Sequence, residues 1–210
     1  MFCREGKTRF FRILVICFIF VIAPQWTIAA APSPVAVIQS GTDRALKIIR
    51  SSRKGEAPAL RLRKAEIFNI VDEYFNFEEM AKRALGRPWK DQSQDKRREF
   101  VDLFKQLLFN TYISRVESYT GSNEQILYDS EKIDGDYAVV KTHVVASSQN
   151  YLIEYRLRLV GDEWKAYDVI VEGVSFVDNY RSQFTSILAN ESFDSLLRKM
   201  REKVELASRS

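Results

Sequence analysis

The stretch QILYDSEKIDGDYAVVKTHVVASSQNYLIEYRLRLVGDEWKAYDVIVEG, residues 125–173, alternates apolar and polar side chains with the period of β-strands. Asp134-Gly135 and Gly161-Asp162 are dipeptides typical of short hairpin turns. A third turn is predicted at residues 147–150, where the chain is small and polar. We therefore predict four antiparallel strands, at about 125–132, 137–146, 151–160 and 164–172.

The predicted strands have one apolar face and one wet face. In the third strand the apolar face is expected to hold Tyr151, Ile153, Tyr155, Leu157 and Leu159, and the opposite face Glu154, Arg156 and Arg158. In the last strand we expect Tyr167, Val169 and Val171 to share a face opposite Asp168 and Glu172. Such a pattern is typical of an antiparallel sheet that is covered on a single side.

Helical spacing dominates on both sides of this stretch. Helices are predicted at 33–50 and from about Leu60, and a long helix is expected after the start signal of Asp91 and Gln94. Between them, a capping box of Asn76 and Glu79 should open a short helix that Gly86 and Pro88 close. After Gly173 two further helices follow, one from about Phe176 to Leu188 and one from about Glu191 to Leu206. We predict an α+β fold in which several helices cover one face of a curved four-stranded antiparallel sheet.

The N-terminal thirty residues have the pattern of an export signal. Arg4, Lys7, Arg9 and Arg12 precede an apolar run of eleven residues, and Ala29 to Ala31 offer a cleavage site. The alternative is an uncleaved anchor, but the run is shorter than the roughly 20 residues that span a bilayer. We expect residues 1–30 to be a cleaved signal peptide and residues 31–210 to form a single domain.

The charge and the cysteine content limit what the exported part of the chain can be. The whole chain carries a formal net charge of +4, of which the predicted leader supplies three, so the remainder is close to +1. The basicity of the whole chain is therefore no indication of nucleic-acid binding, and no nucleic-acid partner is predicted. Both cysteines, Cys3 and Cys17, lie in the leader, so no disulfide is expected in the exported protein.

Residues suited to catalysis or metal binding are scarce. His143 is the only histidine and lies within a predicted strand, where a half-buried structural residue is the expected role. Asp134 and Asp136 flank a turn glycine and lack the spacing of a calcium loop. No metal, cofactor or catalytic residue is therefore predicted, and a carrier or an interaction module is favoured over an enzyme. The apolar faces could enclose either a cavity or a solid core.

Five segments together resemble one known family: residues 75–89, 100–119, 139–145, 153–159 and 163–184. They are similar to the MlaC family, also called the toluene-tolerance family, whose members are soluble periplasmic phospholipid-binding components of an ABC-type lipid transport system. The resemblance implies a fold related to the nuclear-transport-factor-2 (NTF2) class, with a cavity that takes the acyl tails of a glycerophospholipid. It also implies two partners, an inner-membrane transporter complex with an MCE-domain ring and an outer-membrane lipoprotein complex. It implies a role in outer-membrane lipid asymmetry, and we expect a monomer.

On this interpretation the tail cavity is formed by residues that face the space between helices and sheet. The candidates are Phe104, Leu107, Leu108, Tyr112, Val140, Val144, Ile153, Tyr155, Leu157, Val169, Val171, Val177, Tyr180 and Phe184. We further expect Tyr180 and Phe184 to pack on the sheet, and Asp168, Asn179 and Arg181 to fix the strand-to-helix corner by hydrogen bonds.

Two alternatives remain open at this point. The first is an envelope adaptor that binds protein partners around a solid core. The second is an enzyme, which would require His143 to face the cavity beside an acid.

Overall fold

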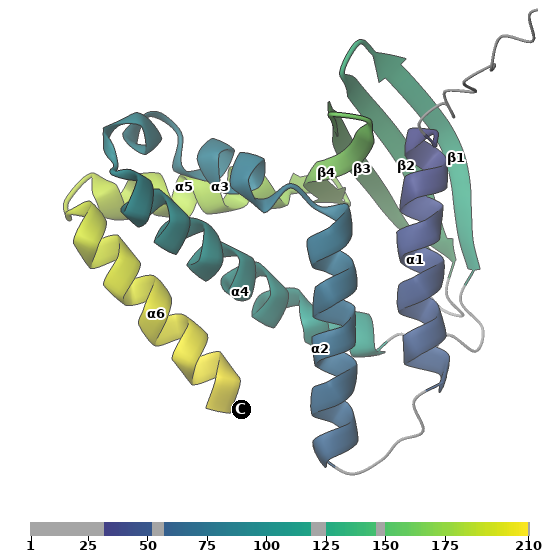
Figure 1. Ribbon diagram of the computed structural model, residues 1–210, viewed down its shortest axis with the longest axis horizontal. Helices are drawn as coiled ribbons and strands as arrows, with labels where there is room; N and C mark the ends of the chain where they lie inside the picture. The colour runs from purple at the N-terminus through teal and green to yellow at the C-terminus, as the bar shows by residue number, and fades with distance from the viewer. Residues whose placement is uncertain (1–31, 52–56, 119–124, 146–149, 210) are drawn as a thin grey trace, which may run out of the picture. The chain divides into compact units, whose positions relative to one another are not determined.

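The computed structural model describes residues 32–51, 57–118, 125–145 and 150–209 (Figure 1). The predicted signal peptide, with its cleavage site at Ala29 to Ala31, lies outside the described residues, as do residues 147–149 of the predicted third turn. Contacts divide the chain into residues 1–30 and residues 31–210, and the fold below concerns the second unit.

The sheet is an antiparallel meander of five strands in the order β1-β2-β3-β4-β5. Its strands are β1 (Gln125–Asp134), β2 (Tyr137–Val145), β3 (Asn150–Val160), β4 (Glu163–Val171) and β5 (Val174–Ser175). The first four agree with the predicted ranges to within about two residues, but the prediction of four strands omitted β5. This strand has two residues, too few to show an alternation, and it pairs with the end of β4 through Val171 and Val174. Glu172 and Gly173 make the tight turn between them with φ angles of 49° and 80°.

A β-bulge in β4 changes which residues share a face. Arg156 pairs with Asp168 while Leu157 pairs with Ala166, so Tyr167 is left as the extra residue. Its ring lies edge-on to Tyr137, with centroids 6.1 Å apart. The prediction that Tyr167 shares the face of Val169 and Val171 was wrong, because the inserted residue moves its side chain to the outer face of the sheet.

Two helices lie along the inner face of the sheet (Figure 1). Helix α1 (Pro34–Ser51) packs on β1 and β2, and α2 (Ala57–Tyr74) packs on α1 and β4. The buried contact between α1 and the sheet is apolar throughout. It consists of Ile38, Ala138, Val140, Leu157, Trp164 and Ala166.

The junction between α2 and α3 (Phe77–Leu85) is fastened to β4. The Asn76 N–H donates to the Ala166 carbonyl over 2.8 Å. The Asn76 side chain accepts from the Glu79 N–H over 2.9 Å, which confirms the predicted helix start. The Glu79 carboxylate pairs with Arg83 over 2.7 Å, so only the first half of the capping box forms.

The remaining helices build a core of their own beside the sheet. After a 3₁₀ turn, η1 (Arg87–Asp91), come α4 (Gln94–Ser118), α5 (Phe176–Leu188) and α6 (Phe193–Arg209). The predicted long helix is present, but it begins at Gln94, later than a cap at Asp91 would place it, and Ser93 rather than Asp91 accepts from its first turn, at the Lys96 N–H. Helix α3 packs on α5, and α4 packs on α6.

Aromatic rings fill this helical core. Phe100 and Phe104 of α4 are fully buried, and Phe104 lies 5.3 Å from Tyr180 and 5.9 Å from Phe184, measured between ring centroids. The prediction that Tyr180 and Phe184 pack on the sheet was therefore wrong. Both rings pack on α4, because α5 turns away from the sheet after its first residues.

Candidate functional site

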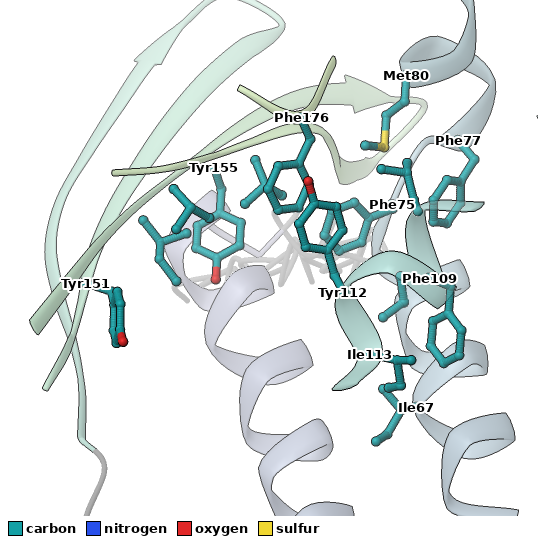
Figure 2. Close-up of a pocket in the computed structure, with 15 residues that line it drawn as sticks. Ile67, Phe75, Phe77, Met80, Phe109, Tyr112, Ile113, Tyr151, Tyr155 and Phe176 are labelled. Carbon is teal, nitrogen blue, oxygen red and sulfur yellow. The ribbon is translucent and has the colours of Figure 1, made fainter. Parts of the chain in front are cut away.

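An apolar cavity of about 290 Å³ lies between the inner face of β3 and β4 and the helices α2 and α4, with the starts of α3 and α5 at its edge (Figure 2). No charged residue belongs to its described lining. The lining residues are Ile67, Val71, Phe75, Phe77, Met80, Leu108, Phe109, Tyr112, Ile113, Tyr151, Ile153, Tyr155, Val169, Val171 and Phe176.

Strand alternation and helix periodicity bring these side chains together. On β3, Tyr151, Ile153 and Tyr155 project to the same side because they are spaced two residues apart. On α4, Leu108 and Tyr112 are four residues apart and so lie on one helix face. Figure 2 shows Tyr151 lying apart from the other labelled side chains, at the end of its strand. The cavity is thus walled by a sheet on one side and by helices on the other.

The ring of Phe176 closes one edge of the cavity. It stacks on Tyr112 with centroids 3.9 Å apart and an interplanar angle of 8° (Figure 2). Phe176 is the first residue of α5, so its position depends on the corner between the sheet and that helix.

A buried carboxylate holds this corner. Asp168, which is 3% exposed, accepts hydrogen bonds from the Val177 N–H (3.1 Å) and the Ser175 hydroxyl (2.7 Å). Arg156 lies 3.6 Å from the same carboxylate. The Ser175 oxygen in turn accepts from the Asp178 N–H and so caps α5. Phe176 is fixed because both of its neighbours are bound to Asp168.

The predicted roles of three polar residues at the corner can now be compared with the structure. The prediction for Asp168 is confirmed. Arg181 does fix α5, but it does so by donating to the Arg83 carbonyl oxygen at the end of α3, over 2.9 and 2.8 Å. Asn179 is exposed and accepts from Gln183 within its own helix, so it does not hold the corner.

A second apolar cavity of about 240 Å³ adjoins the first, between α1, α2 and strands β1 to β3. Gly41 allows α1 and α2 to approach closely here, because a Cβ atom at this position would lie 3.0 Å from the Tyr74 ring. The Tyr74 hydroxyl also bonds to Ser40 over 2.9 Å. The lining residues are Ile38, Gly41, Thr42, Ala45, Leu46, Ile49, Ile67, Ile70, Val71, Tyr74, Phe75, Ile126, Val144, Ile153 and Tyr155.

The predicted cavity residues divide into two groups of seven. Those at a cavity wall are Leu108, Tyr112, Val144, Ile153, Tyr155, Val169 and Val171. Those in the packed cores instead are Phe104, Leu107, Val140, Leu157, Val177, Tyr180 and Phe184. All fourteen face inward. Whether an inward side chain borders open space or packs on another side chain depends on where the nearest helix lies. The periodicity of strands and helices does not contain this information.

Several wall residues were not among the predicted ones. Phe75 and Phe77 flank the Asn76 cap, and their apolar character next to a helix start was the available signal. Phe109 and Ile113 extend the apolar surface of α4 beyond the helix face that holds the predicted cavity residues. Ile67 and Val71 are four residues apart on α2, so they lie on one helix face, and that face borders the cavity.

His143 does not belong to either cavity. Its strand neighbours Thr142 and Val144 are buried on the inner face, so His143 projects from the outer face, where its Nδ1 atom pairs with Asp129. The half-buried structural role is confirmed, and the enzyme alternative loses the cavity histidine that it required. Over the described ranges, no three His, Cys, Asp or Glu side chains are grouped as metal ligands would be. In the same part of the chain no helix has the length and apolarity of a membrane span.

The fold and the site together define an α+β protein with an open antiparallel sheet and an uncharged apolar cavity between sheet and helices. The model of the family described as MlaC protein matches residues 39–202, and the chain belongs to the MlaC family.

Two known proteins are similar over most of the chain. The "intermembrane phospholipid transport system binding protein MlaC" of Haemophilus influenzae is 25% identical in an alignment of 182 residues that covers 84% of each chain. A solved structure of a phospholipid-binding protein from Ralstonia solanacearum, in complex with a phospholipid, matches with a TM-score of 0.71 and 23% identity. The match covers 86% of this chain and 99% of that one. At this identity the structural likeness shows a shared fold.

Proposed function

We propose that this protein is a periplasmic phospholipid carrier that holds the acyl tails of a glycerophospholipid in the apolar cavity and catalyses no reaction. The observation that carries the proposal is the cavity itself, about 290 Å³ of space whose described lining contains no charged residue. Space of this kind fits hydrocarbon and offers no site for a charged substrate.

The comparisons support the proposal. The Haemophilus relative is named for phospholipid transport between membranes, and the Ralstonia neighbour was solved with a phospholipid bound. In the proposed assignment, residues 1–30 are a cleaved signal peptide, residues 31–210 form a single lipid-binding domain, and the protein is monomeric. The relation of its fold to the NTF2 class belongs to the same proposal.

Cargo exchange must then take place in docked complexes. Each methylene withdrawn from water contributes roughly 0.8 kcal/mol, so a lipid with about 30 tail methylenes faces a barrier on the order of 20 kcal/mol if it leaves through water. Partners that shield the tails remove this barrier. We assign these roles to an inner-membrane ABC transporter complex with an MCE-domain ring and an outer-membrane lipoprotein complex, between which the carrier maintains outer-membrane lipid asymmetry.

Mass spectrometry of an organic extract tests the proposal directly. The protein is expressed with export to a bacterial periplasm and purified without detergent. We expect close to one phospholipid, or more, per protein molecule. A stably folded protein without lipid would refute the carrier function and favour the envelope adaptor.

A pair of matched variants connects the lipid to the cavity. Val171 lines the cavity on β4, whereas Val139 of β2 projects from the outer face. We expect Val171→Arg to lose the bound lipid, because a guanidinium would have to be buried among apolar side chains. Val139→Arg should retain it. Equal retention by both variants, each folded by circular dichroism, would separate lipid binding from this cavity.

A further inference from the structure

The two apolar cavities share a wall. Five residues line both of them: Ile67 and Val71 of α2, Phe75 directly after that helix, and Ile153 and Tyr155 of β3. These five residues, called the partition below, come from one face of α2, from the residue that follows this helix, and from one face of β3. The space between helices and sheet is therefore divided into two neighbouring chambers.

Each chamber also has a wall of its own, on opposite sides of α2. Leu108 of α4 and Val171 of β4 line only the first chamber, whereas Ala45 of α1 and Val144 of β2 line only the second. Helix α2 lies between α1 and α4, because Ile67 packs in one buried cluster with Ile49 of α1 and Ile113 of α4. A chain in one chamber would thus be separated from a chain in the other by the α2 side of the partition.

The chambers meet at one end of the sheet. Val144, in the second chamber, is the direct cross-strand partner of Tyr151, in the first. Ile126 of β1, also in the second chamber, pairs with Val144 in the same row. A molecule lying across this row would have access to both chambers.

A ligand with two hydrocarbon chains tied at one end matches this arrangement. We infer that the two acyl chains of one lipid separate at the partition and occupy one chamber each, with the linked end over the row of Ile126, Val144 and Tyr151. This inference rests on the proposed function and adds to it the place of each chain. The two volumes, about 290 and 240 Å³, are similar, as two chains of one lipid require. A single-chain lipid would leave one chamber empty, so the carrier selects two-chain lipids.

Filling one chamber at a time tests the division. Ala45→Trp places a large side chain in the second chamber only, and Val171→Trp does the same in the first. Each variant and the wild type are incubated with vesicles that contain equal amounts of palmitoyl-oleoyl phosphatidylglycerol and palmitoyl lysophosphatidylglycerol. The protein is then separated from the vesicles, and the bound ratio of single-chain to two-chain lipid is measured by mass spectrometry.

We expect the wild type to bind the two-chain lipid and each variant to raise the ratio at least tenfold. Every methylene kept in water weakens binding about fourfold, so displacing two or more suffices. Circular dichroism shows whether each variant folds. If Ala45→Trp does not, Ala45→Leu replaces it, with an expected shift of about fourfold.

The outcomes separate the two proposals. If the wild type binds neither lipid, the carrier function is refuted, and with it the division of the two acyl chains between the chambers. If the wild type binds the two-chain lipid and Ala45→Trp leaves the ratio unchanged, the carrier function stands but both chains share the first chamber, and the division is refuted.

Discussion

Replacement of Asp168 should destabilise the protein more than replacement of any exposed acid. Asp168→Ala removes two charge-assisted hydrogen bonds, to the Val177 N–H and the Ser175 hydroxyl, and leaves both donors without their acceptor. It also removes one of the two carboxylates near Arg156, which lies 3.6 Å from Asp168 and 3.4 Å from Glu154, and it takes a negative charge from the N-terminus of α5. Hydrogen bonds to a charged group contribute about 1.5 to 3 kcal/mol each, so the loss of two should cost about 3 to 5 kcal/mol in free energy of unfolding.

Urea denaturation measures this loss. With a slope of about 2 kcal/mol per molar urea, the midpoint should fall by about 1.5 to 2.5 M. Asp178→Ala is the matched control, because Asp178 is exposed in the first turn of the same helix and pairs with the exposed Arg181, at 3.4 Å. That change should cost less than about 1 kcal/mol. A cost for Asp168→Ala no greater than for Asp178→Ala would refute the argument that this carboxylate holds the corner.

Three further predictions concern the core, the tyrosines and the cargo. Phe104→Ala should lower the free energy of unfolding, measured by urea denaturation, by about 3 to 5 kcal/mol, because Phe104 is enclosed by rings. Val171→Ala should lower it by about 1 kcal/mol or less, because Val171 borders open space. Equal costs would contradict the placement of Phe104 in solid core and of Val171 at a cavity wall. Burial raises the pKa of Tyr180 despite the opposing effect of its hydrogen bond with Thr111, so its contribution to stability is present below the ordinary tyrosine pKa of about 10 and is lost as pH rises through the higher folded value. The wild type should lose more stability than Tyr180→Phe between pH 9 and 12, and parallel pH profiles would contradict this. Delipidation should lower the melting temperature by roughly 5 to 10 °C, the effect of losing a ligand present at about 100 times its Kd; an unchanged melting temperature in calorimetry would show that no ligand stabilises the fold.

The periodicity of residues 125–173 was sufficient to predict the sheet, because each strand has one buried and one wet face over most of its length. It was insufficient wherever the pairing slips by one residue. At Tyr167 the β-bulge inserts a residue without changing the apolar or polar character of its neighbours. The alternation in the sequence therefore continues, although the side chain of Tyr167 lies on the other face of the sheet. The short strand β5 was missed for a related reason, since two residues define no period.

The sequence also could not predict which inward residues line a cavity and which lie in solid core. Tyr155 and Leu157 are adjacent on the inner face of β3, yet Tyr155 lines both cavities and Leu157 is fully buried. What separates them is α1, which packs over Leu157 in the cluster with Ile38. Local spacing tells which way a side chain points, and only the position of a helix distant in sequence tells what it meets.

The solid aromatic core and the open cavity have opposite effects on stability. In core-substitution series, empty apolar space costs about 24 cal/mol per Å³, so 290 Å³ of empty cavity corresponds to about 7 kcal/mol. That amount is comparable with the whole free energy of unfolding of many domains, about 5 to 15 kcal/mol. The rings around Phe100, which contacts Trp89, Phe104, Phe184 and Phe193, supply dense packing elsewhere in the chain. Because α3 to α6 bury these rings among themselves rather than on the sheet, the inner face of β3 and β4 can remain open without loss of the fold.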